Sequence, residues 1–207
     1  MFVVDASASV VENDYLGWRR VKHFIIGLTQ GFTISLTDTR VGLTIFSNDA
    51  TNRPGYPGVP SDAVGFFYLT NFTNSADLTS AIQRLHFFGG YTNTPAGLTV
   101  AYRTILQESV GDRLDVPNVA VVITDGAANV GTTMLSSVAA ELQKKATVIC
   151  VGISQNVYPD ELEDIATSHD LVFNATDFSA LAGKVNTIVE GICKAVPTPT
   201  PIPPSRK

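Results

Sequence analysis

Cysteine and histidine are scarce in this chain of 207 residues. Its two cysteines, Cys150 and Cys193, are too few for a disulfide-rich scaffold or for a zinc site built from thiolates. The three histidines, His23, His86 and His169, are scattered, and no two of them have the spacing of metal ligands. These absences argue against a histidine-rich metal centre and against a hydrolase with a serine–histidine–aspartate triad.

An excess of positive charge and long apolar runs are also missing. Fourteen basic residues stand against nineteen acidic ones, and the net charge of −5 argues against nucleic-acid binding and attachment to anionic membranes. No apolar run approaches the roughly 18 residues of a membrane-spanning helix. Apolar residues make up 44% of the chain and charged residues 16%, which is typical of a globular protein with a sizeable core.

Two kinds of apolar pattern alternate along the chain. Continuous apolar runs predict buried strands, and apolar residues spaced by three and four predict amphipathic helices. Strands are expected at residues 2–5, 41–46, 118–124, 147–153 and 171–173, with an edge strand within 65–69. Helices are expected at residues 14–31, 76–85, 95–107, 133–145, 159–166 and 181–192. This alternation predicts a doubly wound α/β fold, with a mostly parallel central sheet flanked by helices on both faces.

Oxygen-bearing side chains follow two of these strands and precede one helix. Asp5, Ser7 and Ser9 follow the first strand, Asp125 follows the strand at 118–124, and Thr92 lies in a glycine-rich segment before a helix. In a doubly wound fold these segments meet at the carboxyl edge of the sheet, where ligands bind. Two carboxylates with several hydroxyls favour a hard divalent cation, and they suit Mg²⁺, which keeps water ligands and leaves a position for a ligand's carboxylate. Taken singly, such residues are also typical of helix caps and Asp-Gly turns.

Three motifs in this order resemble the von Willebrand factor A domain. They are Asp5-x-Ser7-x-Ser9 after an apolar strand, then GGYTNTPAGL, then VVITDG. The resemblance runs from residue 1 to about Cys193, and it is to the extracellular type found in integrin I domains, matrilins and collagen VI. It implies a domain over residues 1–193, with the first strand truncated at its start, and a Pro/Thr-rich linker or tail over 194–207.

The resemblance also implies a metal-ion-dependent adhesion site, where a bound ion receives an acidic residue of a protein ligand. The ion implied is Mg²⁺, with Mn²⁺ or Ca²⁺ as alternatives. In this family the two serines bind the ion directly, the two aspartates commonly act through bridging waters, and the threonine does either. The matching residues in this chain are Asp5, Ser7, Ser9, Thr92 and Asp125.

Residues around these motifs carry further expectations. Thr94 is expected to cap the helix that begins at Pro95. Segment 51–75 is longer than the family's usual connection. Secreted members often pair a cysteine before the first strand with one after the last helix; Cys193 fills the second position, so we expect a free thiol or a link between chains. Cys150 is expected in the core. The rim of the site, which would set the ligand's identity, is expected to include Val10, Tyr91, Asn93 and Ala127.

Two sequence features bear on the cellular compartment. The sequons at Asn71 and Asn174 are candidate N-glycosylation sites, and both are expected on surface turns. Together with the Pro/Thr-rich tail and Cys193, they favour an extracellular or cell-surface location.

The leading hypothesis is therefore a non-enzymatic adhesion module that binds an extracellular matrix or cell-surface protein, and neither nucleic acid nor the membrane interior. An enzyme is disfavoured because no GxxxxGK[ST] or GxGxxG follows a strand. Ser7 also stands where a haloacid-dehalogenase-like nucleophile motif needs a second aspartate. Two alternatives stay open: a structural extracellular-matrix domain with a stabilising metal site, and an intracellular A domain that serves as an assembly factor.

Overall fold

The structure is a computed structural model that describes residues 1–12, 14–47, 63–154 and 157–195. Six strands of this part form one sheet in the order β3-β2-β1-β4-β5-β6, parallel except for β3, which pairs antiparallel with β2 at one edge. The strands are β1 (Phe2–Asp5), β2 (Leu43–Phe46), β3 (Ala63–Phe67), β4 (Val119–Thr124), β5 (Thr147–Ile153) and β6 (Val172–Ala175).

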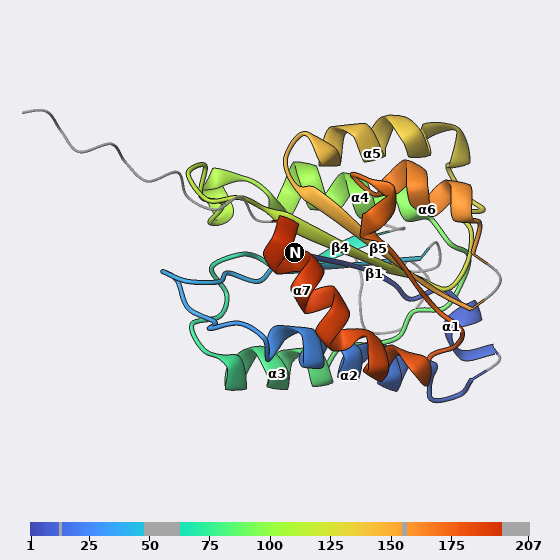
Figure 1. The fold of residues 1–207 in the computed structure, drawn as a ribbon, viewed down its shortest axis with the longest axis horizontal. Coiled ribbons are helices and arrows are strands. Elements are labelled where there is room, and N and C mark those ends of the chain that lie inside the picture. The colour runs from blue at the N-terminus through green and yellow to red at the C-terminus, as the bar shows by residue number, and fades with distance from the viewer. Residues whose placement is uncertain (13, 48–62, 155–156, 196–207) are drawn as a thin grey trace, which may run out of the picture.

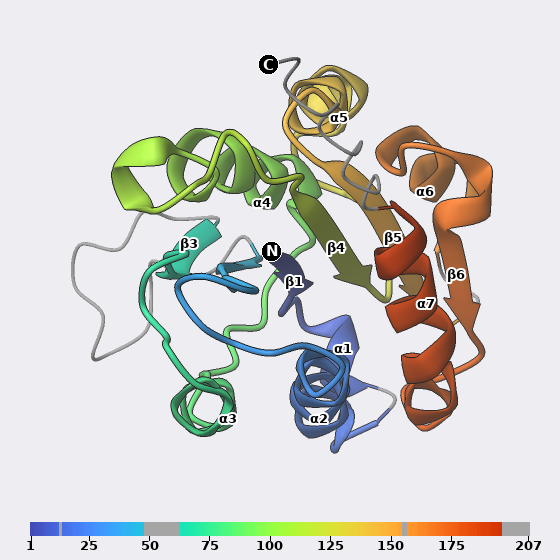
Figure 2. The same cartoon turned by 60° about the vertical axis from the view of Figure 1, so that its left-hand side comes forward.

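Helices cover both faces of this sheet, as Figures 1 and 2 show. One face carries α4 (Thr94–Val100), α5 (Leu135–Gln143) and α6 (Pro159–Ile165). The other carries α2 (Gly17–Thr29), α3 (Ser75–Gln83) and α7 (Val185–Ala195). The predicted doubly wound α/β fold is confirmed. The edge strand expected within 65–69 is β3, which begins at Ala63 and runs antiparallel to β2.

The central strands divide their side chains between two hydrophobic cores. Val4 of β1 and Val121 of β4 belong to the core shared with α2, α3 and α7. Their neighbours Val3 and Val122 belong to the core shared with α4, α5 and α6. Successive side chains of a strand point to opposite faces, so strands covered on both faces need continuous apolar runs. Cys150 of β5 lies fully buried in the second core as a free thiol, as predicted, and burial raises its pKa.

Several boundaries differ from the sequence prediction. The region predicted as a helix over 14–31 is preceded by a separate short helix, α1 (Ser9–Glu12), and α2 begins only at Gly17, which lies tightly against the carbonyl of Val10. The helix predicted over 95–107 ends as an α-helix at Val100. It continues as a π-helical turn over Ala101–Ile105, where Leu106 N donates to Ala101 O at 2.9 Å.

The sequons and the remaining segments are placed as follows. Asn71 is exposed in the turn after β3, as expected. Asn174 is exposed too, but it lies within the edge strand β6 and not in a turn after the last strand. The tail from residue 196 and residues 48–62, which include part of the long segment, lie outside the described residues. Among the described residues, none of the helices combines the length and apolar character that a membrane crossing requires.

A substitution at Gly97 tests how tightly α4 packs on the sheet. A Cβ at this position would lie 2.5 Å from Cδ1 and 2.9 Å from Cγ of Phe46, which is fully buried and cannot move aside. We expect Gly97→Ala to lower the free energy of unfolding by about 1–3 kcal/mol. Gly183→Ala is the matched control, because a Cβ there meets nothing within 4 Å. Chemical denaturation of both variants checks this, and equal stability would contradict the packing described.

Candidate metal centre

The predicted site residues lie at the switch point of the sheet, where the order in which strands are added changes direction. β1 and β4 are neighbours at the centre; the strands after β1 extend to one side and those after β4 to the other. Such a switch point leaves a crevice at the carboxyl ends of the strands. Asp5 is the last residue of β1, and Asp125 directly follows β4. Both are nearly buried, with 2% and 4% of their surface exposed.

Hydrogen bonds connect four of the five predicted ligands. Asp5 accepts from the backbone N–H of Ser7 at 2.8 Å and from the hydroxyl of Thr124 at 2.7 Å. The hydroxyl oxygens of Ser7 and Ser9 lie 3.0 Å apart, and Ser9 donates to Asp125 Oδ1 at 2.8 Å. The motif after β1 therefore folds back so that its serine hydroxyls lie between the two carboxylates.

Thr92 reaches the same place from a different part of the chain. The two preceding glycines, Gly89 and Gly90, have positive φ of 79° and 82°, a conformation that favours glycine. Backbone bonds from Gly89 N to Ala6 O (2.8 Å) and from Ala8 N to Gly90 O (2.9 Å) fix this loop beside the first motif. A Cβ at Gly126 would lie 3.9 Å from both Ser9 Oγ and Thr92 Oγ1, so the two hydroxyls face one small space.

Asn129 and Glu161 support the site and were not foreseen from the sequence. Thr92 N donates to Asn129 Oδ1 at 2.9 Å, and Asn129 N donates back to Thr92 O at 3.0 Å. Glu161 of α6 accepts from Ala128 N at 2.9 and 3.1 Å. These bonds join the loop after β4 to both the Thr92 loop and α6. They connect residues 33 and 37 positions apart, a spacing for which the sequence offers no local signal.

Two of the four expected rim residues face outward. Tyr91 is 65% exposed and Ala127 is half-buried. Val10 is only 1% exposed and belongs to the core, so the structure does not present it to a ligand. Asn93 is buried as well. Of the four expected rim residues, only Tyr91 and Ala127 are therefore accessible to a ligand.

The cap of α4 differs from the expectation. Asn93, not Thr94, is the N-cap residue, and its side chain accepts from Ala96 N at 3.1 Å. Thr94 is the first residue of the helix and is fully buried, and its hydroxyl has no hydrogen-bond partner among the described residues. An asparagine caps at least as well as a threonine, and the sequence Thr92-Asn93-Thr94 offers both at adjacent positions.

Electrostatics make the two carboxylates costly to keep charged. Burial raises the pKa of Asp5 above its ordinary value. Burial, and then the charge of Asp5, raises the pKa of Asp125 to about 7, against a weaker opposing effect of the bond from Ser9. In the described part of the chain neither carboxylate forms an ion pair. A divalent cation would neutralise both groups, so the residues present fit such an ion.

The five predicted metal ligands all offer oxygen atoms. Within the described ranges, no three histidine, cysteine, aspartate or glutamate side chains are grouped so that they could hold a metal ion. A metal bound here would therefore depend on the hydroxyls of Ser7, Ser9 and Thr92 beside the two carboxylates. Such a set suits a hard cation such as Mg²⁺, Mn²⁺ or Ca²⁺.

Comparison with known proteins gives the family. A family model described as the von Willebrand factor type A domain matches residues 1–187, and the chain belongs to this family.

Similar proteins include a collagen chain, a matrilin and a protein of the mussel byssus. Human collagen alpha-6(VI) chain is 29% identical over 197 residues, which cover 94% of this chain and 8% of the collagen chain. Mouse matrilin-2 is 27% identical, covering 95% of this chain and 19% of matrilin-2. A solved structure of proximal thread matrix protein 1 from the mussel byssus, with a zinc-occupied MIDAS (metal-ion-dependent adhesion site) motif, has a TM-score of 0.79 at 24% identity and covers 93% of this chain and 44% of that one. The chain thus spans a fifth or less of either curated relative.

The raised pKa of Asp125 predicts a pH dependence of stability in the metal-free protein. The carboxyl titrates near pH 7 in the fold and near 3.8 in the unfolded chain, so its neutral form favours folding. Its contribution is complete below about pH 4 and is lost as the pH rises to about 7. Asp125→Asn, measured with chelator, should gain up to about 1.4 kcal/mol relative to the parent chain per pH unit across this window. A constant difference from pH 4 to 8 in chemical denaturation would contradict it.

Proposed function

We propose that this chain is a non-enzymatic protein-binding module for adhesion, which binds an acidic residue of a protein ligand through a divalent ion. The ion would be held by Asp5, Ser7, Ser9, Thr92 and Asp125, with Mg²⁺ favoured and Mn²⁺ or Ca²⁺ as alternatives. The ion's chemistry is that of a Lewis acid with a position open to a ligand's carboxylate.

One observation carries this proposal. Two buried aspartates lie beside three hydroxyls at the switch point of the sheet, and neither forms an ion pair in the described part of the chain. Buried charges are normally paired or coordinate a metal. The loops that carry these residues are fixed by backbone bonds, so the oxygens are held in place before an ion arrives.

The relatives support the setting of the proposal. A collagen chain, a matrilin and a byssal matrix protein are similar to this chain, and the byssal protein has a MIDAS motif occupied by zinc. These relatives support our proposal that the module acts outside the cell or on its surface, with a matrix or cell-surface protein as partner. Asn71 and Asn174, both exposed, are the proposed glycosylation sites. The proposed domain spans residues 1–193, followed by a linker or tail over 194–207.

A structural role is the second candidate, and the raised pKa values favour it. An ion that neutralises Asp5 and Asp125 would stabilise the fold even without a partner. The two roles separate in a thermal melt. A structural domain would gain stability from Mg²⁺ alone, whereas an adhesion module would gain further when a capped aspartate peptide is added to the Mg²⁺-loaded protein.

Calorimetric titration of the chelator-treated chain with MgCl₂ and MnCl₂ tests the metal site. We expect one ion to bind, and we expect Asp125→Ala to abolish binding because it removes one of only two carboxylates. Asp170→Ala is the matched control: it removes the same charge from an exposed site at the other end of β6. If neither ion binds the parent chain, even with excess acetate to complete the coordination shell, the proposed function is wrong.

Glu161 should act on the metal through the loop after β4. Glu161→Ala leaves Ala128 N without its acceptor and frees the loop that begins at Asp125, so we expect metal affinity to fall about tenfold. Glu161→Gln keeps an acceptor oxygen and should stay within about threefold of the parent chain. Calorimetry on both variants checks this, and equal affinities for alanine and glutamine would show that the loop does not depend on this bond.

A further inference from the structure

Helices α2 and α3 gather positive charge in a chain whose net charge is −5. The two helices lie side by side on one face of the sheet (Figures 1 and 2). Residues 15–37, which include α2, contain two arginines, a lysine and a histidine but no acidic residue. Residues 78–107, which include α3 beyond its first turn, contain no acidic residue either. Charge of one sign is therefore concentrated on these two helices.

The packing of α2 against the end of α3 brings three of the cations together. Arg19 and Lys22 are three residues apart on α2, a spacing that puts their side chains on one side of the helix. The Lys22 ammonium donates to Gln83 O at 2.9 Å and to Leu85 O at 3.4 Å, and Arg84 lies between these two residues. Both acceptors are neutral carbonyls. We call Arg19, Lys22 and Arg84 the basic face.

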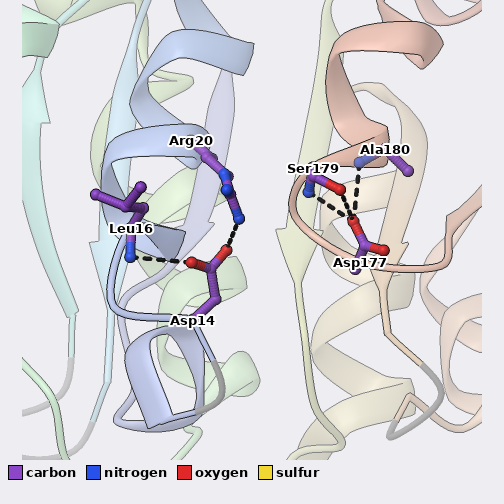
Figure 3. Close-up of polar contacts among 6 residues, drawn as sticks. All are labelled: Asp14, Leu16, Arg20, Asp177, Ser179 and Ala180. Carbon is purple, nitrogen blue, oxygen red and sulfur yellow. Dashed lines mark hydrogen bonds and ion pairs between the residues drawn. The ribbon is translucent and has the colours of Figure 1, made fainter.

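The charges of the basic face are not neutralised by the described part of the chain. Arg20 shows the contrast, because it forms an ion pair with Asp14, which also accepts from Leu16 N at 3.0 Å (Figure 3). Its neighbour Arg19 is exposed and forms no ion pair with a described residue, and the same is true of Arg84. Both guanidinium groups are therefore available to an anion from outside the chain.

The position of Arg19 is unfavourable for the helix that carries it. The first turn of α2 has no acidic residue, and its N-cap residue, Leu16, makes no side-chain hydrogen bond. The start of a helix carries a partial positive charge, so a cation in the first turn is repelled. His23, four residues after Arg19, offers it no attraction. An anion bound at the basic face would remove this repulsion.

The surroundings of the basic face favour a sulfated sugar over a protein segment as that anion. Protein partners bind mainly through aromatic and apolar anchors. None of the exposed large apolar side chains in the described part of the chain lies in α2, α3 or residues 84–86. A sulfated polysaccharide is hydrophilic along its length and needs no such anchor. Its sulfate oxygens match the paired N–H groups of a guanidinium, as those of phosphate do.

We propose that the basic face, Arg19, Lys22 and Arg84, binds a sulfated polysaccharide. Arg19 and Arg84 contact the sulfate oxygens through their guanidinium groups. Lys22 has a third N–H beyond the two that bind carbonyls, and it donates this one to the sugar chain. This second binding surface requires neither the metal nor the acidic residue of a protein ligand, so it goes beyond the proposed function.

Calorimetric titration with a heparin hexasaccharide tests the basic face. Chelator is present throughout, so that the metal centre plays no part and the outcome leaves the proposed function untouched. A hyaluronan hexasaccharide, which has carboxylates but no sulfates, and a capped hexaglutamate peptide are titrated beside it. The variants are Arg19→Gln and Arg84→Gln. Arg103→Gln is the matched control, because Arg103 is exposed and follows α4 on the other face of the sheet.

We expect heparin to bind, and to bind more weakly as the salt concentration rises. Each of Arg19→Gln and Arg84→Gln should lower its affinity about three- to fivefold, the size of a favourable exposed ion pair. Arg103→Gln should leave the affinity unchanged. The proposal is overturned if heparin does not bind, or if Arg103→Gln weakens binding as much as Arg19→Gln does. It is also overturned if hyaluronan or hexaglutamate binds as tightly as heparin, since the face would then not select sulfates.

Discussion

The burial of two carboxylates side by side is the constraint on which this site depends. Asp5 and Asp125 end adjacent central strands, so the parallel pairing of β1 with β4 brings them together. Burial removes hydration from both carboxylates and so raises the pKa of each, and the charge of Asp5 raises the pKa of Asp125 further. A cation that offset both charges would remove this cost. The proposed affinity for a metal would thus be a consequence of strand order.

The neighbouring polar groups serve to orient these oxygens. Thr124 and the backbone N–H of Ser7 take the lone pairs of Asp5 that would otherwise point into the protein. Asn129 and Glu161 hold the loop after β4 from opposite sides, one through the Thr92 loop and one through α6. A site held in this way changes little when an ion arrives, so less of the binding free energy is lost to ordering side chains.

How much of this structure the sequence predicts depends on how far apart in the sequence the interacting residues lie. The spacing of apolar residues and the continuity of apolar runs are local signals. They identify the central strands, most helices and the arrangement of helices on both faces of the sheet. Because strand ends meet at one edge, the meeting of Asp5 with Asp125 also follows from the sequence. The supporting residues do not, since Glu161 acts through a contact set by how α6 packs. The same holds for the ion pair of Arg20 with Asp14, because the turn that brings the two together leaves no mark on the apolar pattern.

The two proposed roles, adhesive and structural, would both depend on the free energy of binding the ion. An ion that relieves the repulsion between Asp5 and Asp125 stabilises the fold, and a carboxylate that completes the ion's shell adds to the same stabilisation by mass action. The two roles therefore differ in what the surroundings of the ion recognise, and not in the metal centre itself. Those surroundings include the exposed Tyr91 and a hollow of about 310 Å³ that is lined by Ser9 and Asp125 of the site and by Asp14 and Asp177. If the proposed function holds, selectivity among acidic partners would come from these surroundings, because the buried oxygens would treat every carboxylate alike.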